Sequence, residues 1–313
     1  MLVAIAFAHQ PGPDCAVMRP RERRLCGALL AGLIGLLGFA RECPARGDDA
    51  TRPAEARGVA KTAASHERVV FDRKSKWNRI LVIDRKDERS LFFGDGNGDT
   101  QSTVSLRDPR AVPMEYIRHA GGALAFTPKR GSALVVGLGG GTYPMLLRRS
   151  FPAMTIDVVE LDPMVRAVAR DYFGFVEDGS MRVHIADGAA FIRRTRRRWD
   201  IIFLDAYGAA GVPAALATGA FFAGVARRLA PGGLVIANVS ENNPNRERVL
   251  ITRIRNAFRE CILQRTPTSD NVIVVAGFAL PKDIEGSLRQ LDREGALPFP
   301  VAPMAPLHRS CPK

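Results

Sequence analysis

The chain has 313 residues, of which 46% are hydrophobic and 25% charged, a composition typical of a globular protein with one large domain or two unequal ones. A chain of this length can bury a full hydrophobic core without covalent cross-links such as disulfides. The net charge of +13 raises the question of nucleic acid, but only 7% of the residues are aromatic and no interleaved basic and aromatic platform is visible, which disfavours nucleic-acid binding. Five cysteines show no CxxC pair and no metal-ligand spacing with the five histidines, so neither a disulfide framework nor a metal site is expected.

The first 40 residues have the pattern of an export signal. Four arginines between positions 19 and 24 precede an apolar run from Leu25 to Ala40, and the chain then turns polar. We expect a cleaved signal peptide, with a retained membrane anchor or a buried core helix as the alternatives. Residues 41–66 lack apolar periodicity and are predicted to form a flexible linker.

Residues 67–127 are predicted to form a small antiparallel β-hairpin domain and a linking helix. Turn residues bound three short strand patterns, over Val69–Asp72, Arg79–Arg85 and Ser90–Phe93. The glycine-rich stretch after the third strand predicts a loop, and a helix is expected across Pro113–Ala125.

From residue 128 to residue 296 strand and helix patterns alternate, as a Rossmann-like doubly wound α/β domain requires. The main expected strands are Ala133–Val136, Thr155–Val159, Trp199–Leu204, Leu234–Val239 and Asn271–Ala276. The expected helices include Tyr143–Arg149, Ala189–Ile192, Leu216–Leu229, Arg246–Leu263 and Ile284–Glu294. Cys261 falls inside one of these helices, where a buried structural thiol is expected. Residues 297–313 form a proline-rich tail that we expect to lie loosely on the surface.

The most informative segment begins with a glycine-rich turn. Five residues, Gly137-Leu138-Gly139-Gly140-Gly141, follow the first buried strand and precede a helix. Glycine permits a tight turn and lets a ligand approach the backbone at a helix N-terminus. The alternative interpretation is a tight connection with no ligand.

Acidic residues follow the next strands. Glu160 lies about 20 residues after the glycine turn, where a carboxylate commonly accepts hydrogen bonds from the two hydroxyls of a ribose. Asp187 and Asp205 end the next two units. Because parallel strands end at one edge of a sheet, we expect these groups to share one crevice. The alternatives are a solvated strand end for Glu160, a helix N-cap for Asp187 and a structural loop acid for Asp205.

Together these residues resemble the spermidine synthase family, the polyamine aminopropyltransferases, and most closely its bacterial spermidine-synthase-like branch. The resemblance covers Arg79–Ala276. Single blocks also suit a generic methyltransferase, whereas the combination of Gln101, the pair Tyr172-Phe173 and the block from Asp187 to Phe191 is more specific.

The resemblance implies a methyltransferase-type sheet that binds S-adenosylmethionine or its decarboxylated form, with no metal. It also implies an amine as the small-molecule acceptor and a homodimer or homotetramer assembled through the hairpin unit. By position, Glu160 would hold the ribose and Asp187 the adenine amino group. The cofactor-binding residues implied in this way are Gln101, Gly137, Gly139, Gly141, Glu160, Asp187 and Gly188.

The chain departs from the family at two acidic positions. The family aspartate that grips the aminopropyl ammonium falls on Gly140, and the second of two aspartates after the fourth strand falls on Gly208. Asp205 keeps the first of those two, which is placed to take the proton from the attacking amine. Each lost charge-assisted bond removes roughly 1.5–3 kcal/mol of interaction with a dication, which weakens the case for orthodox putrescine specificity. Tyr207 and Glu241 are candidate acceptor-binding residues, and Tyr207 is equally a candidate pocket wall.

Three functional hypotheses follow. The first is aminopropyl transfer with Asp205 as base or amine orienter. The second is methyl transfer from S-adenosylmethionine, which suits a turn with no acid at Gly140 because this cofactor keeps its carboxylate. The third is a non-catalytic nucleoside-binding or scaffold protein, since fold alone does not determine function. The N-terminal pattern predicts an exported or membrane-anchored protein, whereas the need for an adenosyl cofactor predicts a cytoplasmic one.

Overall fold

The computed structural model describes residues 67–313, except 97, 209–210, 242, 305–307 and 310–313. The predicted signal peptide and the predicted linker therefore lie outside the described residues. Within the described ranges, no helix combines the length and the hydropathy that crossing a bilayer requires.

The N-terminal part of the described chain is an antiparallel sheet of four strands in the order β1-β2-β3-β4. The strands are β1 Glu67–Lys74, β2 Arg79–Arg85, β3 Glu88–Phe93 and β4 Thr100–Ser105. The fourth strand was not among the three predicted ones, and β4 pairs with β3 despite a register shift between Leu91 and Phe92. Gln101 is consequently a strand residue.

A second sheet has the order β12-β10-β11-β9-β8-β5-β6-β7. From β5 the chain runs outward through β6 and β7, and it then returns to the other side of β5 with β8 and β9. The edge between β5 and β8 is thus a topological switch point, where α/β sheets bind ligands. The strands are β5 Ser132–Val136, β6 Thr155–Glu160, β7 Met181–Ile185, β8 Trp199–Leu204, β9 Leu229–Val239, β10 Glu260–Arg265, β11 Val272–Gly277 and β12 His308–Arg309.

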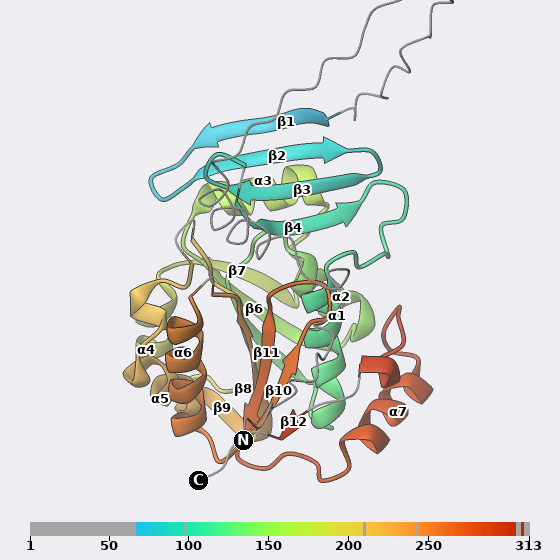
Figure 1. Ribbon diagram of the computed structural model, residues 1–313, viewed down its shortest axis with the longest axis vertical. Helices are drawn as coiled ribbons and strands as arrows, with labels where there is room; N and C mark the ends of the chain where they lie inside the picture. Colours follow the sequence, from blue (N-terminus) through green and yellow to red (C-terminus); the bar gives the residue numbers. More distant parts are fainter. Residues whose placement is uncertain (1–66, 97, 209–210, 242, 305–307, 310–313) are drawn as a thin grey trace, which may run out of the picture. The chain divides into compact units, whose positions relative to one another are not determined.

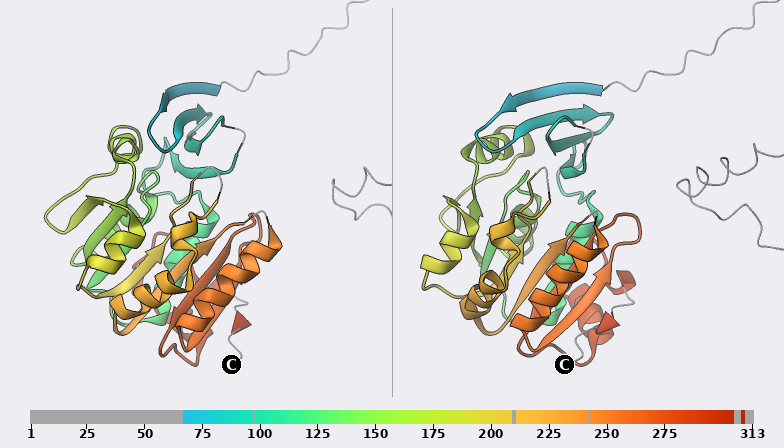
Figure 2. Two further views of the ribbon diagram at one scale, coloured as in Figure 1. Left: turned by 90° about the vertical axis from the view of Figure 1, so that its left-hand side faces the viewer. Right: turned by 60° about the vertical axis from the view of Figure 1, so that its left-hand side comes forward.

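Helices cover both faces of this sheet, which confirms the predicted doubly wound α/β fold. Apolar residues on one sheet face pack with α1 Glu115–Gly122, α2 Thr142–Ser150, α3 Pro163–Phe173 and α7 Ile284–Glu294. The opposite face packs with α4 Gly188–Arg194, α5 Gly219–Arg228 and α6 Pro244–Ala257. Figure 2 shows α4, α5 and α6 as one layer outside the strands.

The predicted helix Arg246–Leu263 is too long. Helix α6 ends at Ala257, and the chain enters β10 three residues later. Residues 260–265 pair along β11 in continuous antiparallel register. A short apolar run is ambiguous between helix and strand, and the sheet pairing decides the outcome here. Cys261 is buried as expected, but it is disulfide-bonded, so the expectation of a free thiol is wrong.

The C-terminal segment is better anchored than predicted. The backbone N–H groups of Val301 and Ala302 donate to the Asp292 carboxylate, with N–O distances of 2.7 and 2.9 Å. Val301 is fully buried, so the expectation of a loosely placed segment is wrong at this residue.

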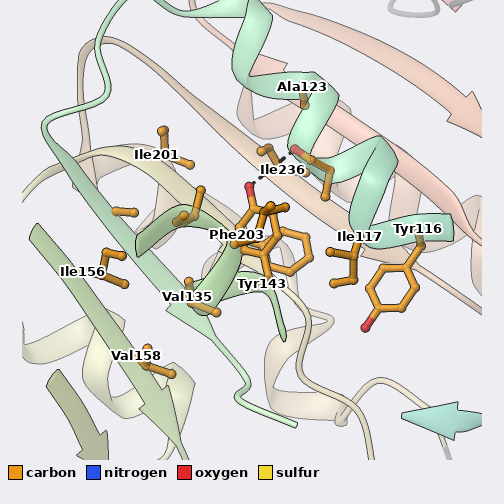
Figure 3. Close-up of a cluster of buried hydrophobic side chains, with 14 of the residues drawn as sticks. Tyr116, Ile117, Ala123, Val135, Tyr143, Ile156, Val158, Ile201, Phe203 and Ile236 are labelled. Atoms are coloured by element: carbon orange, nitrogen blue, oxygen red, sulfur yellow. Dashed lines mark hydrogen bonds between the residues drawn. The ribbon is translucent and has the colours of Figure 1, made fainter. Parts of the chain in front are cut away.

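Aromatic packing joins α1 and α2 to the carboxyl end of β8. The rings of Tyr143 and Phe203 lie 4.0 Å apart between centroids, and the Tyr143 hydroxyl donates to the carbonyl of Ala120 at 3.4 Å. Figure 3 shows these two rings in the buried cluster and Tyr116 at its edge. This packing places α1 beside the switch point of the sheet.

Candidate functional site

A crevice of about 880 Å³ lies at the carboxyl ends of β5, β6, β8 and β9. Strand β4 and the turn between β1 and β2 contribute to its lining from the small sheet. All but one of the sequence-predicted site residues line it, and Gly141 is the exception. Those brought together are Gln101, Gly137, Gly139, Glu160, Asp187, Gly188, Asp205, Tyr207 and Glu241.

The glycine turn is packed against other parts of the chain. A Cβ at Gly137, where φ is +97°, would lie 2.2 Å from the backbone oxygen of Asp205. A Cβ at Gly139 would lie 2.8 Å from the Ser102 hydroxyl. Gly141 precedes α2 with φ +77°, and a Cβ there would meet Phe175 at 2.5 Å. Glycine is therefore required at these positions by packing and backbone conformation.

Gly140 has no room for the acid that the family resemblance places there. A Cβ at this position would lie 2.9 Å from both Phe173 Cδ1 and Ser102 Cβ. The Gly140 N–H donates to Ser102 Oγ at 2.8 Å. The serine and the phenylalanine thus fill the space of the missing carboxylate.

Two backbone donors fix the carboxylate of Glu160. The N–H of Asp162 donates to Oε1 at 2.8 Å, and the N–H of Leu138 donates to Oε2 at 3.0 Å. Burial raises the pKa of Glu160, against the effect of these hydrogen bonds. Each oxygen keeps further acceptor capacity, so the group can accept both hydroxyls of a ribose.

The neighbouring Asp162 has a structural role. Its Oδ1 accepts from the N–H of Met164 at 2.8 Å and so caps α3, and the Ser75 hydroxyl donates to Oδ2. The side chain is buried beneath the turn between β1 and β2. Asp162 thus holds the start of α3 and the turn of the small sheet together, and it also lines the crevice.

Asp187 caps a helix and also lines the crevice. Its Oδ1 accepts from the N–H of Ala190 at 2.7 Å and caps α4, and the residue also lines the crevice. A Cβ at the adjacent Gly188 would lie 2.8 Å from Val136, so the chain passes close to β5 here. A cap that uses one oxygen leaves the second available to an amino group of a ligand.

Asp205 is buried between two hydrogen-bond donors. Asn238 Nδ2 donates to Oδ1 at 2.8 Å, and the Tyr116 hydroxyl donates to Oδ2 at 3.1 Å. Burial raises the pKa of Asp205 to about 7, although both hydrogen bonds oppose the shift. Burial and the nearby Asp205 charge also raise the pKa of Tyr116 well above its usual value, so the phenol stays a donor. A carboxylate with this pKa can accept a proton near neutral pH.

Tyr207 and Glu241 are both engaged within the protein. The Tyr207 hydroxyl donates to the Asn238 carbonyl and accepts from the Ser240 N–H, both at 2.7 Å, which favours its role as a wall. Glu241 forms an ion pair with Arg246 at 3.2 Å. Glu115, a further acid at the start of α1, accepts from the N–H and hydroxyl of Thr268 and does not line the crevice.

Sequence reasoning missed several lining residues. Trp77 and Asn78 enter from the turn between β1 and β2, and nothing in their local pattern signals a site. Tyr116 and Asn238 act through their contacts with Asp205. Of these residues, only Asn238 could have been predicted from the sequence, because it lies near the end of a predicted strand and strand ends line such sites. In the described part of the chain, no cluster of three or more metal-ligating side chains is present.

Comparisons with known proteins agree with this geometry. The family model described as "Spermine/spermidine synthase domain" matches residues 112–273. A polyamine aminopropyltransferase of Vibrio vulnificus is 32% identical over 175 residues, which are 54% of this chain and 58% of the relative. One from Chromobacterium violaceum is 30% identical over 199 residues, or 63% of this chain and 75% of the relative. The chain thus spans little more than half the length of the Vibrio relative.

Among solved structures, human methyltransferase-like protein 13 in complex with SAH is also similar. The two chains share 26% sequence identity with a TM-score of 0.54, over 59% of this chain and 94% of the human one. The similarity therefore extends to methyltransferases as well as to aminopropyltransferases.

Proposed function

We propose that this chain, which belongs to the spermine/spermidine synthase family, transfers an aminopropyl group from decarboxylated S-adenosylmethionine to an amine acceptor. The observation that carries the proposal is Asp205, a buried carboxylate with a pKa of about 7 in a crevice that also holds Glu160 and the glycine turn. A base of this kind is what an ammonium acceptor needs before its nitrogen can react.

The donor half of the crevice fits an adenosyl group. Glu160 would accept the ribose hydroxyls, the free oxygen of Asp187 would accept the adenine amino group, and Gly137 and Gly139 would border the sulfonium chain. Gln101 on β4 would cover the ligand from the small sheet. This assignment is supported by the spare acceptor capacity of both acids.

The bound cofactor supplies a methylene carbon activated by a sulfonium. The acceptor nitrogen forms a bond to that carbon while the carbon–sulfur bond breaks, its electron pair going to sulfur. The proton released by the nitrogen passes to Asp205. Asn238 and Tyr116 hold this carboxylate in place with hydrogen bonds to its two oxygens. Most of the acceleration would come from positioning the two reactants.

Methyl transfer is the second candidate, and the filled space at Gly140 favours it. Ser102 and Phe173 replace the carboxylate that would hold the aminopropyl ammonium. A turn without that acid also tolerates a cofactor that keeps its own carboxylate. The likeness to a human methyltransferase structure is compatible with this alternative.

Calorimetric titration with each cofactor tests the proposal. Tighter binding of the decarboxylated form, followed by an aminopropyl mass increase on an amine acceptor, is the expected result. Tighter binding of S-adenosylmethionine and a methyl mass increase would establish the second candidate instead. Binding of neither cofactor would contradict both and favour a non-catalytic scaffold.

We also propose that the chain is exported or membrane-anchored. The apolar run Leu25–Ala40 and the disulfide at Cys261 support this location, because disulfides persist in oxidising compartments. A fusion of residues 1–66 to a reporter that is active only outside the cytosol tests the idea, and a silent reporter would reject it.

A homodimer or homotetramer built through the small sheet completes the proposal. β1 is an edge strand of the described four-stranded sheet, and Val69 on it is exposed, which permits pairing with a second copy. Light scattering gives the mass in solution, and a monomer would contradict this assembly.

A further inference from the structure

The crevice has an uneven charge distribution. Among the described residues that line it, seven are acidic and one, Arg246, is basic. An acidic crevice suits ammonium groups, and a cationic side chain within it repels the far end of a diamine. Arg246 is therefore a poor neighbour for the second ammonium of a diamine acceptor.

Arg246 lies in the first turn of α6, on the side of the crevice formed by the end of β9. Its Nε is 3.2 Å from Glu241 Oε2, and its Nη2 is 3.4 Å from Oε1. Both distances exceed the 2.7–2.9 Å that is usual for charge-assisted bonds. The Glu241 side chain is 6% exposed, whereas that of Arg246 is 54% exposed. The buried glutamate thus steadies an arginine whose remaining N–H donors are accessible.

Gly211 lies beside this ion pair and pairs with Gly208. Gly208 and Gly211 form a bridge with mutual N–H to carbonyl bonds of 3.0 and 3.1 Å. A Cβ at Gly208 would meet nothing within 4 Å. One at Gly211 would lie 3.4 Å from the Glu241 carboxylate and 3.7 Å from Arg246 Nη2. No side chain from either glycine therefore shields the arginine.

A continuous wall connects this ion pair to the proposed base. Asp205 accepts from Asn238, and the Asn238 carbonyl accepts from Tyr207. The Tyr207 hydroxyl in turn accepts from the Ser240 N–H, next to Glu241. One end of this wall thus holds the Asp205 carboxylate, and the other end holds the Arg246 guanidinium.

We propose that Arg246 binds a carboxylate at the far end of the acceptor, so that the acceptor is an ω-amino acid and not a diamine. This inference rests on the proposed transfer function. The amine of the acceptor reaches Asp205, and its carboxylate accepts from the guanidinium, whose planar fork matches that group. Asp270 also lines the crevice, but it is exposed to solvent, which screens its charge.

The test compares acceptors that differ only in the distal group. The full-length protein is given decarboxylated S-adenosylmethionine with ω-amino acids of three to six carbons, the matching diamines, or the matching monoamines. Release of the thioether nucleoside measures transfer. We expect kcat/KM for the best amino acid to exceed that for its monoamine at least about tenfold, from one added charge-assisted interaction.

Arg246→Gln should remove this advantage, so that kcat/KM for the amino acid falls to about the value for its monoamine measured with the same variant. The matched control is Arg248→Gln, because Arg248 lies on the same helix, binds Asn245 at 3.0 Å and does not line the crevice. The control should keep the amino-acid preference. A loss of preference in both variants would overturn the assignment to Arg246.

Acceptor binding provides a second readout without turnover. The chain has two tryptophans, of which Trp77 lines the crevice and is 40% exposed, whereas Trp199 is 1% exposed. Addition of 4-aminobutanoate should change the Trp77 fluorescence, and Arg246→Gln should abolish the change. Trp77→Phe identifies the reporter, since the signal must disappear in that variant.

The outcomes separate the inference from the proposed function. Faster transfer to a diamine than to any amino acid would overturn the inference while the transfer function stands, and Asp270→Asn would then show whether Asp270 holds the second ammonium. Arg246-dependent fluorescence without nucleoside release from any acceptor would contradict the transfer function and support the carboxylate site. Absence of both signals would overturn the inference.

Discussion

The two halves of the crevice are held together in different ways. In the donor half, Glu160 accepts from two backbone N–H groups and Asp187 from one, so the fold itself orients both acids. In the acceptor half, the polar end is a side-chain ion pair between Glu241 and Arg246, reached past glycines that carry no side chains. A side-chain substitution leaves backbone N–H donors in place, whereas a single substitution at Glu241 or Arg246 removes the ion pair.

This difference indicates where the chain can vary without losing its fold. The donor half repeats the strand-end acids and the turn that the family resemblance requires. The family acid that falls on Gly140 is missing from the donor half. The acceptor half has lost the family acid that falls on Gly208, and it contains an arginine. Substitutions in the donor half should therefore affect folding or cofactor binding, and those in the acceptor half should affect the choice of acceptor.

The largest effect is expected for Gly137→Ala. The added Cβ would lie 2.2 Å from the Asp205 oxygen, and φ is +97°, so the backbone must move. We expect a loss on the order of 4 kcal/mol or more in the free energy of unfolding. Urea denaturation measures it. Gly208→Ala is the matched control from the acceptor half, because its Cβ meets nothing within 4 Å, and equal midpoints for the two variants would contradict the packing argument.

Asp205→Asn should lower kcat by roughly 10²- to 10⁴-fold, the usual range for loss of a general base. The affinity for the cofactor should change little, because Asp205 lies toward the acceptor. In the unaltered protein the rate should rise with pH through about 7, where Asp205 loses its proton. The variant should not show this step. Rates measured from pH 5 to pH 9 test both statements, and an unchanged turnover would remove Asp205 from the mechanism.

The same substitution should stabilise the protein at alkaline pH. Because burial raises the pKa of Asp205 from 3.8 to about 7, the folded state holds a proton that the unfolded chain has lost between these values. Stability from this group is therefore full below pH 3.8 and falls as pH rises toward 7. Asn carries no charge, so the variant should melt at a higher temperature than the unaltered protein at pH 8. A lower melting temperature at pH 8 would indicate that the variant lost packing as well as charge.

Glu160→Gln tests cofactor binding in the donor half, with a smaller expected effect than the changes above. The amide keeps one acceptor oxygen, so one of the two backbone donors, Leu138 or Asp162, loses its partner. We expect cofactor affinity to fall about 10- to 100-fold, as for the loss of a charge-assisted hydrogen bond. Calorimetry measures the affinity. Glu285→Gln, at an exposed position of α7, is the control and should leave it unchanged.

The sequence predicted the donor half well because its signals are local. A strand followed directly by glycine or an acid defines both the element and the edge of the sheet, as at Gly137 and Glu160. The limits of the strand Trp199–Leu204 and the helix Ile284–Glu294 were predicted to the residue. These elements have clear apolar periods and clear ends.

The remaining features depend on long-range pairing. β4 consists mostly of polar residues and becomes a strand because β3 offers a paired edge. β10 follows α6 without a strong break, and its strand state depends on β11. Tyr116 is 89 positions from Asp205 in the sequence, so no local pattern connects them. The sequence did not predict Arg246 as a site residue, because it lies on a helix and the site was expected at the ends of the strands.

The smallest expected effect comes from restoring the two family acids, and the two halves should respond in opposite ways. Gly208→Asp enters open space, so the variant should fold and use a diamine roughly twofold to tenfold better, as partly exposed charges allow.

Gly140→Asp should destabilise the protein and give no gain in cofactor affinity, because Phe173 and Ser102 occupy the space. Transfer assays and melting curves on both variants provide the measurement. If Gly140→Asp folds normally and binds the decarboxylated cofactor more tightly, the donor half is less rigid than its contacts indicate. If Gly208→Asp instead leaves the ratio of amino-acid to diamine transfer unchanged, the acceptor does not pass this glycine, and Arg246 acts on a ligand elsewhere in the crevice.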